Sequence, residues 1–527
     1  MRILVSDSLS QQGLDLLSKE EDFEVDFKTN LIPDELVERI GDYDALIIRS
    51  ATRVTDKVIE AANRLKVIGR AGVGVDNIEL DAATRRGVLV VNTPAGNTIS
   101  AAEHTLTLML ALSRRILSAG ISLRNGEWMR SRFTGVELYG KVLGVMGLGR
   151  IGSEVIRRAQ AFGMETIAFD PYITSAAAEK QGVRLVKRDN LFKEADYISV
   201  HIPLTPETYH SIGERELSLM KSECSLINTA RGGIIDEDEL YKALKAGLIA
   251  GAALDVFEEE PPTRNPLLAL DNVLMTPHLG ASTAEAQVHV SVEVAQQVIN
   301  ALRGLPVAGA VNLPKMDWQT IEVFDPYLTL VEKIGSFHAQ IVDGQISEIN
   351  IHYTGSLFDE TDVSLITVSL QKGLLTPVLQ TNVNYVNAPF FIKQRGIRII
   401  ETKSRTDGSF ANAISVTVVT DQGERVIEGT SFGHQEARIV RIDQHHVNVK
   451  PGGYMVLLYN QDQPGMIGLV GTILGENNIN IADMTVGRSE VGELAVTIIN
   501  VDSPVPRDVL QHIENRDEIS FVKQVKL

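Results

Sequence analysis

One glycine-rich stretch limits the fold of this chain more than any other. Residues 141–171 read KVLGVMGLGRIGSEVIRRAQAFGMETIAFDP: an apolar run precedes Gly147, Gly149 and Gly152, and a helical pattern leads to a second apolar run that ends at Asp170. In a dinucleotide-binding βαβ unit, three glycines at this spacing serve a tight turn, the close approach of backbone to a pyrophosphate, and the packing of helix on strand. The flanking strand, the helix and the acidic Asp170 agree with that unit. We therefore predict a nucleotide-binding domain here.

Composition excludes several classes of function. At 527 residues the chain is too long for one core, which predicts three or four domains. A formal charge of −18 disfavours binding to nucleic acid, which needs a basic surface. The single cysteine, Cys224, leaves neither a disulfide nor a zinc cluster, so we expect a reducing cytoplasm and no metal. The N-terminus MRILVSDSLS is typical of a first strand rather than a signal peptide, and no apolar run has membrane-spanning length.

This glycine-rich stretch, the glycine fingerprint, begins about 140 residues into the chain because another α/β unit precedes it. Apolar runs such as RILVSD, DALIIRS and GVLVVNTP alternate with helical patterns before residue 98, which predicts a complete parallel, doubly wound sheet. A long helix over residues 100–116, with Ser100 as N-cap and Glu103 completing a capping box, carries the chain into the inserted domain. A second helix, TAEAQVHVSVEVAQQVINALRG, returns it. Two such domains leave a cleft for a small ligand.

Three polar residues at predicted strand ends could carry chemistry. Arg231 follows an apolar strand in NTARGG, Glu260 precedes two prolines in DVFEEEPP, and His278 lies in the turn TPHLGAS. Taken singly, each has an ordinary structural interpretation: a surface ion pair, a member of a solvated acidic run, and a capping residue. Together they supply a cation for a carboxylate, an acid that orients a histidine, and an acid/base that titrates near neutrality. This combination favours hydride transfer to or from a 2-hydroxy acid.

The order of motifs resembles the D-isomer-specific 2-hydroxyacid dehydrogenases. The matching stretches are GRAGVGVDN, NTPAGN, GLGRIG, NTARGG, ALDVFEEEPP and PHLGAST. The tail resembles the long branch of that family: VNAPFFIKQRG and EGTSFG are similar to its intervening domain, and VLLYNQDQPGMIGLVGTILGENNINIADMTVGR to an ACT domain. The resemblance implies NAD-dependent oxidation of D-3-phosphoglycerate to 3-phosphohydroxypyruvate, the first step of phosphorylated L-serine biosynthesis. It also implies a homodimer or homotetramer whose subunits contact each other through the nucleotide-binding domain.

The resemblance implies a fold of four parts. A flavodoxin-like substrate domain, discontinuous over residues 1–98 and 287–314, encloses a Rossmann domain over residues 99–286; both have doubly wound parallel sheets. An α+β intervening domain follows over residues 315–451. A ferredoxin-like ACT domain completes the chain over residues 452–527, where the pattern strand, helix, strand, strand, helix, strand agrees with that fold.

Residue roles follow from the matched motifs. Arg231 is expected to bind the substrate carboxylate and keto oxygen, His278 to exchange the proton with the C2 oxygen, and Glu260 to hold the other imidazole nitrogen. The backbone of Gly72, Val73 and Gly74 is expected to hold the substrate carboxylate, and the cationic candidates for the 3-phosphate are Arg49, Arg70 and Arg130. Asp170 is expected to take both ribose hydroxyls and to repel a 2′-phosphate, which favours NAD over NADP. The other expected cofactor contacts are Arg150 and Ile151 at the pyrophosphate, and Thr205, Ala230, Asp255 and Gly280 around the adenine and nicotinamide.

Two features of the tail point to regulation. Lys393, Arg395, Lys403 and Arg405 form a cationic cluster, which either binds an anionic effector or protects a solvated strand edge. In ACT domains that bind amino acids, a turn such as YNQDQPGMIG faces an asparagine of the next segment across a subunit interface. The matching residues, expected to bind L-serine, are Asn460, Asp462 and Asn480. The family often has histidine or tyrosine at position 460, and an ACT pair that only assembles subunits is the alternative.

The sequence leaves two other functions open. One is a non-enzymatic NAD-sensing protein, because this fold has been adopted for transcriptional corepression; the acidic composition and the ACT tail count against it. The other is a reductase of glyoxylate or hydroxypyruvate. The tail counts against that function as well, because such enzymes usually end near residue 315.

Overall fold

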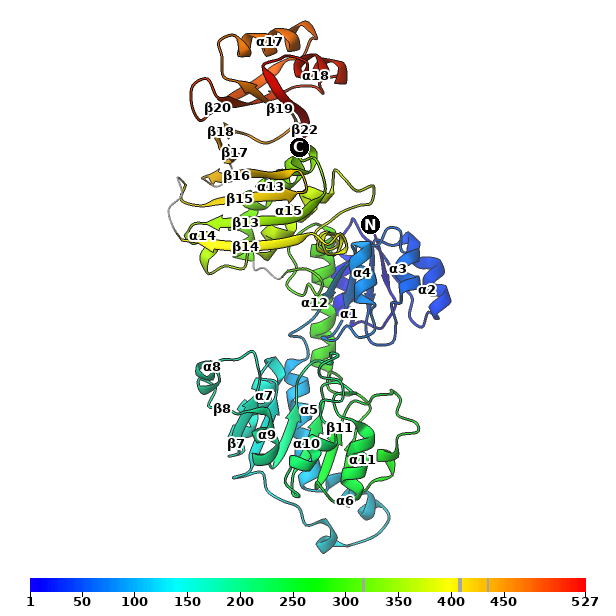
Figure 1. Ribbon diagram of the computed structural model, residues 1–527. Coiled ribbons are helices and arrows are strands. Elements are labelled where there is room, and N and C mark those ends of the chain that lie inside the picture. The colour runs from blue at the N-terminus through cyan, green and yellow to red at the C-terminus, as the bar shows by residue number, and fades with distance from the viewer. Residues whose placement is uncertain (315–317, 406–409, 434–435) are drawn as a thin grey trace.

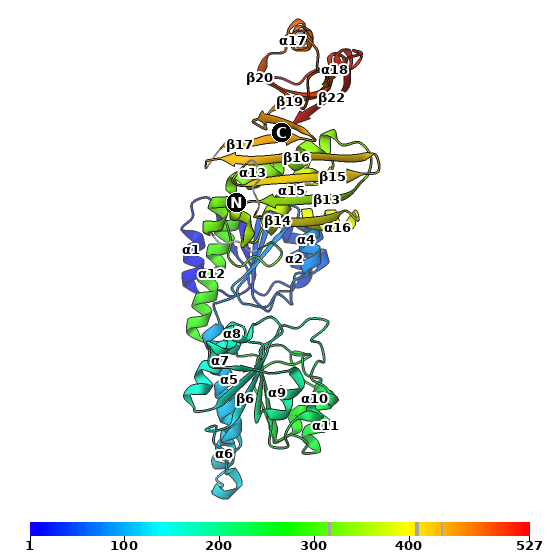
Figure 2. The same ribbon diagram turned by 60° about the vertical axis from the view of Figure 1, so that its left-hand side comes forward.

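The computed structural model describes residues 1–314, 318–405, 410–433 and 436–527 of the chain. Four sheets follow one another along the sequence, and the units built on them are arranged in an elongated molecule (Figures 1 and 2). We call these units the first to fourth domains, with sheets within residues 2–92, 142–275, 346–449 and 454–526. The second and fourth domains lie at opposite ends, and the first and third lie between them.

The first domain is a parallel sheet with the strand order β2-β1-β3-β4-β5. This is the flavodoxin-like order, and the prediction of a doubly wound sheet is confirmed. The central β3 is buried at every position, as expected for a strand covered by helices on both faces. The elements are β1 (Arg2–Val5), α1 (Gln11–Ser18), β2 (Glu24–Phe27), α2 (Pro33–Arg39), η1 (Ile40–Asp42), β3 (Ala45–Ile48), α3 (Asp56–Ala61), β4 (Val67–Arg70), α4 (Leu80–Arg86) and β5 (Leu89–Asn92).

The second domain is a seven-stranded sheet with the order β12-β11-β10-β9-β6-β7-β8, and the predicted Rossmann fold is confirmed. The glycine fingerprint joins its central strand β6 to helix α7. The elements are β6 (Val142–Met146), α7 (Arg150–Ala161), β7 (Glu165–Phe169), α8 (Ser175–Glu179), β8 (Arg184–Leu185), α9 (Arg188–Glu194), β9 (Tyr197–Val200), α10 (Glu214–Leu219), β10 (Ser225–Asn228), α11 (Glu237–Lys245), β11 (Gly251–Leu254), η3 (Pro266–Ala269) and β12 (Val273–Met275).

Two helices join the first and second domains: α5 (Thr98–Ser113) and α12 (Ala284–Leu302). The expected N-cap at Ser100 is wrong: α5 begins two residues earlier, and the Ser100 hydroxyl lies 2.6 Å from that of Thr283, the N-cap of α12. The predicted domain limits at residues 98 and 286 fall within the first turns of α5 and α12, respectively.

A shorter helix, α6 (Ile116–Arg124), follows α5 at an angle of 61° and leads to η2 (Arg130–Phe133). Within the described residues, no single helix is long and apolar enough to cross a membrane; only the bent pair of α5 and α6 reaches that length and composition.

The third domain has a mixed sheet with the order β14-β13-β15-β16-β17-β18, in which β13 and β14 run parallel and the other described strand pairs run antiparallel. Helices α13 and α15 pack together against it. The predicted α+β character is confirmed, while the boundary at residue 315 lies outside the described residues. The elements are α13 (Trp318–Ile341), β13 (Ile346–Thr354), α14 (Ser356–Asp359), α15 (Ser364–Leu375), α16 (Ala388–Gln394), β14 (Arg398–Ser404), β15 (Ala413–Thr420), β16 (Gly423–Phe432), β17 (Glu436–Ile442) and β18 (His445–Val449).

The fourth domain has the antiparallel order β20-β21-β19-β22 and two helices, which confirms the ferredoxin-like prediction. One face of its sheet packs on α17 and α18. The other face shares one apolar core with the third domain, through Met455, Leu457 and Val525 among others. The two domains therefore meet through a buried contact rather than a free linker. The elements are β19 (Tyr454–Gln461), α17 (Met466–Glu476), β20 (Ile481–Arg488), β21 (Leu494–Val501), α18 (Arg507–Glu514) and β22 (Ile519–Lys526).

Candidate active site

The residues predicted to carry chemistry follow the strands of the second sheet at a single edge. All the strand pairs of that sheet are parallel, so their carboxyl ends meet on one side, where ligands bind in doubly wound folds. Backbone N–H groups order the loops at this edge: that of Thr205 donates to Thr208 Oγ1 (2.7 Å) and that of Ala230 to Asn228 Oδ1 (3.0 Å). The predicted residues at the edge are Gly147, Asp170, Thr205, Ala230, Arg231, Asp255, Glu260, His278 and Gly280.

The glycine loop between β6 and α7 has room for a phosphate. Gly147 has φ +92°, and a Cβ there would lie 2.6 Å from the His201 carbonyl oxygen. A Cβ at Gly152 would lie 2.1 Å from the carbonyl oxygen of Gly147, whereas one at Gly149 would meet no atom within 4 Å. The N–H groups of Arg150 and Ile151 belong to the first turn of α7 and have no intrahelical acceptor. This open, donor-lined space fits a dinucleotide pyrophosphate.

Asp170 lies beside this loop. It follows β7 directly, and its Oδ2 accepts a hydrogen bond of 2.8 Å from the N–H of Leu148. Its Oδ1 accepts one of 2.8 Å from Tyr172. These contacts fix the carboxylate next to the glycines, and each oxygen keeps a lone pair for a ribose hydroxyl.

His278 and Glu260 form the predicted pair. His278 Nδ1 lies 2.9 Å and 3.2 Å from the two carboxylate oxygens of Glu260, and both side chains are partly exposed. Burial by itself raises the pKa of Glu260, but the hydrogen bond and charge of His278 and the N–H of Phe257 together hold that pKa below its ordinary value. The ionised carboxylate therefore binds Nδ1–H, which leaves Nε2 for a substrate.

The turn that carries His278 is fixed by Asp255, which is fully buried. Its carboxylate accepts hydrogen bonds from the N–H groups of Leu279 (2.7 Å) and Gly280 (2.8 Å) and from Thr276 Oγ1 (2.6 Å), and its carbonyl oxygen accepts the N–H of His278 (2.9 Å). His104 Nε2, on α5, lies 3.1 Å from the same carboxylate. The structure thus places Asp255 beneath the turn as a support, while its predicted contact with a cofactor stays a prediction.

Arg231 reaches from the second domain to the first. Its Nε donates to Asp76 Oδ2 (2.9 Å) and its Nη1 to the Ala230 carbonyl oxygen (2.6 Å). A Cβ at Gly74 would lie 1.8 Å from Arg231 Nη2, so the guanidinium rests against the loop of Gly72, Val73 and Gly74. The structure therefore brings Arg231 together with the loop predicted to hold the carboxylate.

Arg70 lies at the other side of the same loop. A Cβ at Gly72 would lie 1.7 Å from Arg70 Nη1, and within the described residues the buried Arg70 Nε has no hydrogen-bond partner. Burial, followed by the charge of Arg231, lowers the pKa of Arg70 to about 10. Two guanidiniums held so close favour an anion between them.

The three arginines expected at the 3-phosphate are not all brought together. Arg49 follows β3, beside β4, and burial lowers its pKa. Arg130, by contrast, is exposed on η2, beyond α6, and this segment extends from the far end of the second domain, away from the first (Figure 1). Within one chain the arm holds Arg130 away from the cleft, so its role at the 3-phosphate stays a prediction.

The regulatory residues are only partly brought together. A pocket of about 210 Å³ lies between the turn after β19 and the start of α17, and Asn460, Asp462 and Gly465 line it. Asp462 pairs with Arg488 (3.1 Å), and the buried Asn460 accepts a hydrogen bond from Thr497 Oγ1 (3.0 Å). Asn480 is exposed, donates to Asp502 (2.6 Å) and does not line this pocket. A single chain therefore supplies part of the predicted site.

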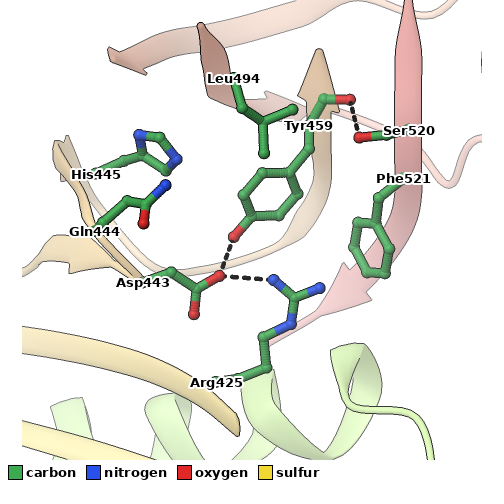
Figure 3. Close-up of a pocket in the computed structure, with 8 residues that line it drawn as sticks. All are labelled: Arg425, Asp443, Gln444, His445, Tyr459, Leu494, Ser520 and Phe521. Atoms are coloured by element: carbon green, nitrogen blue, oxygen red, sulfur yellow. Dashed lines mark hydrogen bonds and ion pairs between the residues drawn. The ribbon is translucent and has the colours of Figure 1, made fainter. Parts of the chain in front are cut away.

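A second pocket lies at the junction of the third and fourth domains (Figure 3). Asp443 accepts from Arg425 Nη1 (2.6 Å) and from the hydroxyl of Tyr459 (2.5 Å). The Arg425 guanidinium lies 5.1 Å from the ring centres of Tyr459 and Phe521. Arg425 and Asp443 neutralise each other's charge. Their contacts with Tyr459 and Phe521 join the third domain to the fourth. The pocket of about 360 Å³ is lined by Arg425, Asp443, Gln444, His445, Tyr459, Leu494, Ser520 and Phe521.

The cationic cluster of the third domain lies on α16 and around the end of the edge strand β14. Arg405 pairs with Asp359, and Lys403 Nζ donates to the Thr361 carbonyl oxygen (2.6 Å). The remaining members, Lys393 and Arg395, lie at the end of α16. These contacts favour the interpretation of a protected strand edge, and an anionic effector remains a prediction.

Comparison with known proteins matches three stretches of the chain to known families. Residues 106–280 match the family described as D-isomer specific 2-hydroxyacid dehydrogenase, NAD binding domain. Residues 323–443 match the D-3-phosphoglycerate dehydrogenase intervening domain, and residues 454–518 match the ACT domain. A D-3-phosphoglycerate dehydrogenase of Methanocaldococcus jannaschii is 46% identical over 100% of both chains. The chain belongs to the D-3-phosphoglycerate dehydrogenase family.

Two further relatives agree with this membership. A protein of the same name from Synechocystis is 44% identical over 100% of this chain and 95% of its own. A solved D-lactate dehydrogenase from Aquifex aeolicus, complexed with NAD and lactic acid, is 30% identical with a TM-score of 0.52, covering 58% of this chain and 96% of its own. The chain is an NAD-dependent oxidoreductase, and the expected cofactor is confirmed.

Proposed function

We propose that this chain oxidises D-3-phosphoglycerate to 3-phosphohydroxypyruvate with NAD, as the first step of phosphorylated L-serine biosynthesis. The observation that carries the proposal is the His278–Glu260 pair, which follows strands of the same sheet edge as the glycine loop. The Arg231–Arg70 pair around Gly72–Gly74 supports it, because it offers two cations to an anionic substrate. The full-length relatives that carry the enzyme's name support the choice of substrate.

The proposal gives each group a part in that reaction. Arg231 and the backbone of the Gly72–Gly74 loop orient the carboxylate of the substrate. His278 accepts the proton of the C2 hydroxyl at Nε2, while Glu260 holds Nδ1–H and stabilises the imidazolium that forms. The glycine loop and Asp170 would hold NAD, which would supply the acceptor for the hydride of C2. In the reverse direction, His278 returns the proton to the oxygen.

The choice of NAD over NADP is assigned to Asp170. Asp170→Ala is expected to weaken NADH binding by about 10-fold and to narrow its advantage over NADPH, because a carboxylate at the ribose repels a 2′-phosphate. The measurement is the dissociation constant of each cofactor from fluorescence titration of both proteins. A wild type that binds NADPH as tightly as NADH would contradict this assignment.

We also propose a homo-oligomer that contacts through the arm of α6 and η2. Ile116, Leu117, Leu123 and Trp128 on this arm are more than half exposed, which is unusual for a cluster of large apolar side chains. In such an assembly Arg130 would serve the cleft of a neighbouring copy. Light scattering after gel filtration tests this assembly, and a monomer mass would contradict it.

We propose a cytoplasmic location as well. The buried single thiol of Cys224 supports it.

We propose L-serine as an effector that binds at the turn after β19. Asp462 can accept from an ammonium group, and the N-terminus of α17 favours a carboxylate, while Gly465, at φ +98°, lets the backbone approach a ligand. Asn480 lies outside this pocket, so a second copy would have to supply it. Serine inhibits only if it binds the inactive state more tightly than the active one.

Calorimetry tests this effector. Titration of L-serine into wild type is expected to release or absorb heat with a millimolar or tighter dissociation constant, and Asp462→Ala is expected to weaken binding by about 10-fold or more because it removes a charged acceptor. Asp508→Ala, an exposed acid at the start of α18, is the matched control and is expected to bind serine normally. No heat in wild type, or equal binding by Asp462→Ala, would leave the fourth domain a purely structural role.

A further inference from the structure

The Arg231 side chain is held by a group of the opposite domain. Asp76, in the loop after β4, accepts a hydrogen bond of 2.9 Å from Arg231 Nε. Arg231 Nη1 donates to the carbonyl oxygen of Ala230. These two contacts occupy one donor at each side of the guanidinium. Arg231 Nη2 lies against Gly74, whose added Cβ would stand 1.8 Å from it.

Charge explains why such a partner is needed. Arg70 and Arg231 lie close enough that the charge of Arg231 lowers the pKa of Arg70, while the charge of Asp76 raises it. Without an anion between them, the two guanidiniums repel each other, and a long side chain such as Arg231 has other rotamers to adopt. An added Cβ at Gly74 would also lie 2.6 Å from Asp76 Oδ2, so Asp76, Arg231 and the loop meet at one point.

We propose that Asp76 is a positioning residue for Arg231, which it orients across the cleft with the free N–H groups toward the Gly72–Gly74 loop. The inference rests on the proposed function only in taking a 2-hydroxy acid as substrate. Asp76 is 58% exposed and contacts the Nε edge rather than the two terminal nitrogens, so it orients the guanidinium without filling the place of a substrate carboxylate. Because Asp76 belongs to the first domain and Arg231 to the second, the same bond favours the conformation in which the cleft between these domains is closed.

A purely structural ion pair makes a different prediction. Exposed pairs contribute little to stability, so neither interpretation expects a change in the thermal midpoint. Positioning, however, predicts a kinetic defect, because a misplaced cation no longer holds the carboxylate in line for hydride transfer. The discriminating readouts are therefore kcat and KM, together with the dependence of any defect on Arg231.

The first test compares Asp76→Ala, Asp76→Asn and the control Asp81→Ala. Asp76→Ala is expected to lower kcat/KM by about 10- to 100-fold with NADH affinity unchanged. Asp76→Asn keeps an acceptor oxygen, so its kcat/KM is expected to be at least about fivefold higher than that of Asp76→Ala. Asp81, an exposed acid of α4, should stay within about twofold of wild type when replaced. The substrate is whichever of 3-phosphohydroxypyruvate, glyoxylate and hydroxypyruvate wild type reduces fastest, so an error in the proposed substrate does not affect the result.

The second test is a double-mutant cycle with Arg231→Lys. If Asp76 acts through Arg231, Asp76→Ala should cause less than about a threefold further loss in the Arg231→Lys background, because the bond to Nε is already absent. The proposal is overturned if Asp76→Ala keeps more than half of wild-type kcat/KM, if Asp76→Asn recovers nothing, or if the loss is equally large with Lys at position 231.

Discussion

His278→Ala is expected to lower kcat by about 10²- to 10⁴-fold, the usual contribution of a general acid/base. His278 Nδ1 is held by Glu260 at 2.9 Å, and its turn is held by Asp255, so Nε2 alone is left to exchange a proton with a substrate oxygen. The measurement is steady-state turnover at saturating NADH and 2-oxo acid. Because the imidazole contacts the substrate rather than the nucleotide, NADH affinity should stay within about twofold.

His446→Ala provides the matched control. His446 is an exposed residue of β18, far from the second domain, and its replacement should leave turnover within about twofold of wild type. A His278→Ala variant that kept more than a third of wild-type turnover would show that another group moves the proton.

Gly149→Ala is expected to raise the dissociation constant of NADH by about 10- to 100-fold, the value of one or two lost hydrogen bonds to a charged group. The structure separates the effect on binding from the effect on folding. An added Cβ at Gly149 meets no protein atom within 4 Å, and the residue has φ −79°, which alanine adopts freely. The added methyl would instead fill the space that the pyrophosphate needs.

The thermal midpoint of Gly149→Ala should therefore equal that of wild type, in contrast to Gly152→Ala, whose Cβ would lie 2.1 Å from a carbonyl oxygen. Gly475→Ala, on α17 of the fourth domain, also adds a methyl in open space and serves as the control for NADH titration. Unchanged NADH binding by Gly149→Ala would place the pyrophosphate elsewhere.

The sequence predicts the two α/β domains well because both faces of their sheets are buried. Strands such as β3 and β10 are apolar or buried at every position, and their alternation with helical patterns leaves few topologies. The same topology brings the candidate site residues together: once the strands are parallel, the loops that carry Arg231, Glu260 and His278 must share one edge.

The contacts that the sequence does not predict join segments far apart in the chain. Asp76 and Arg231 are 155 residues apart, and His104 and Asp255 are 151 apart, so no local pattern indicates either pair. The predicted start of α5 is wrong for the same reason, since the hydroxyl of Ser100 bonds Thr283 rather than capping its own helix. The sequence does indicate the shared core of the third and fourth domains. β19 is apolar on both faces, and only one of them packs against α17 and α18.

The choice of substrate tests the proposed function most directly. NADH oxidation should be followed by the loss of the reduced cofactor's absorbance, with 3-phosphohydroxypyruvate, glyoxylate and hydroxypyruvate side by side. We expect kcat/KM to be greatest for 3-phosphohydroxypyruvate by at least about 10-fold, because the partly buried cations Arg70 and Arg49 gain a phosphate partner that the other two acids lack. An equal or higher kcat/KM for glyoxylate or hydroxypyruvate would contradict it.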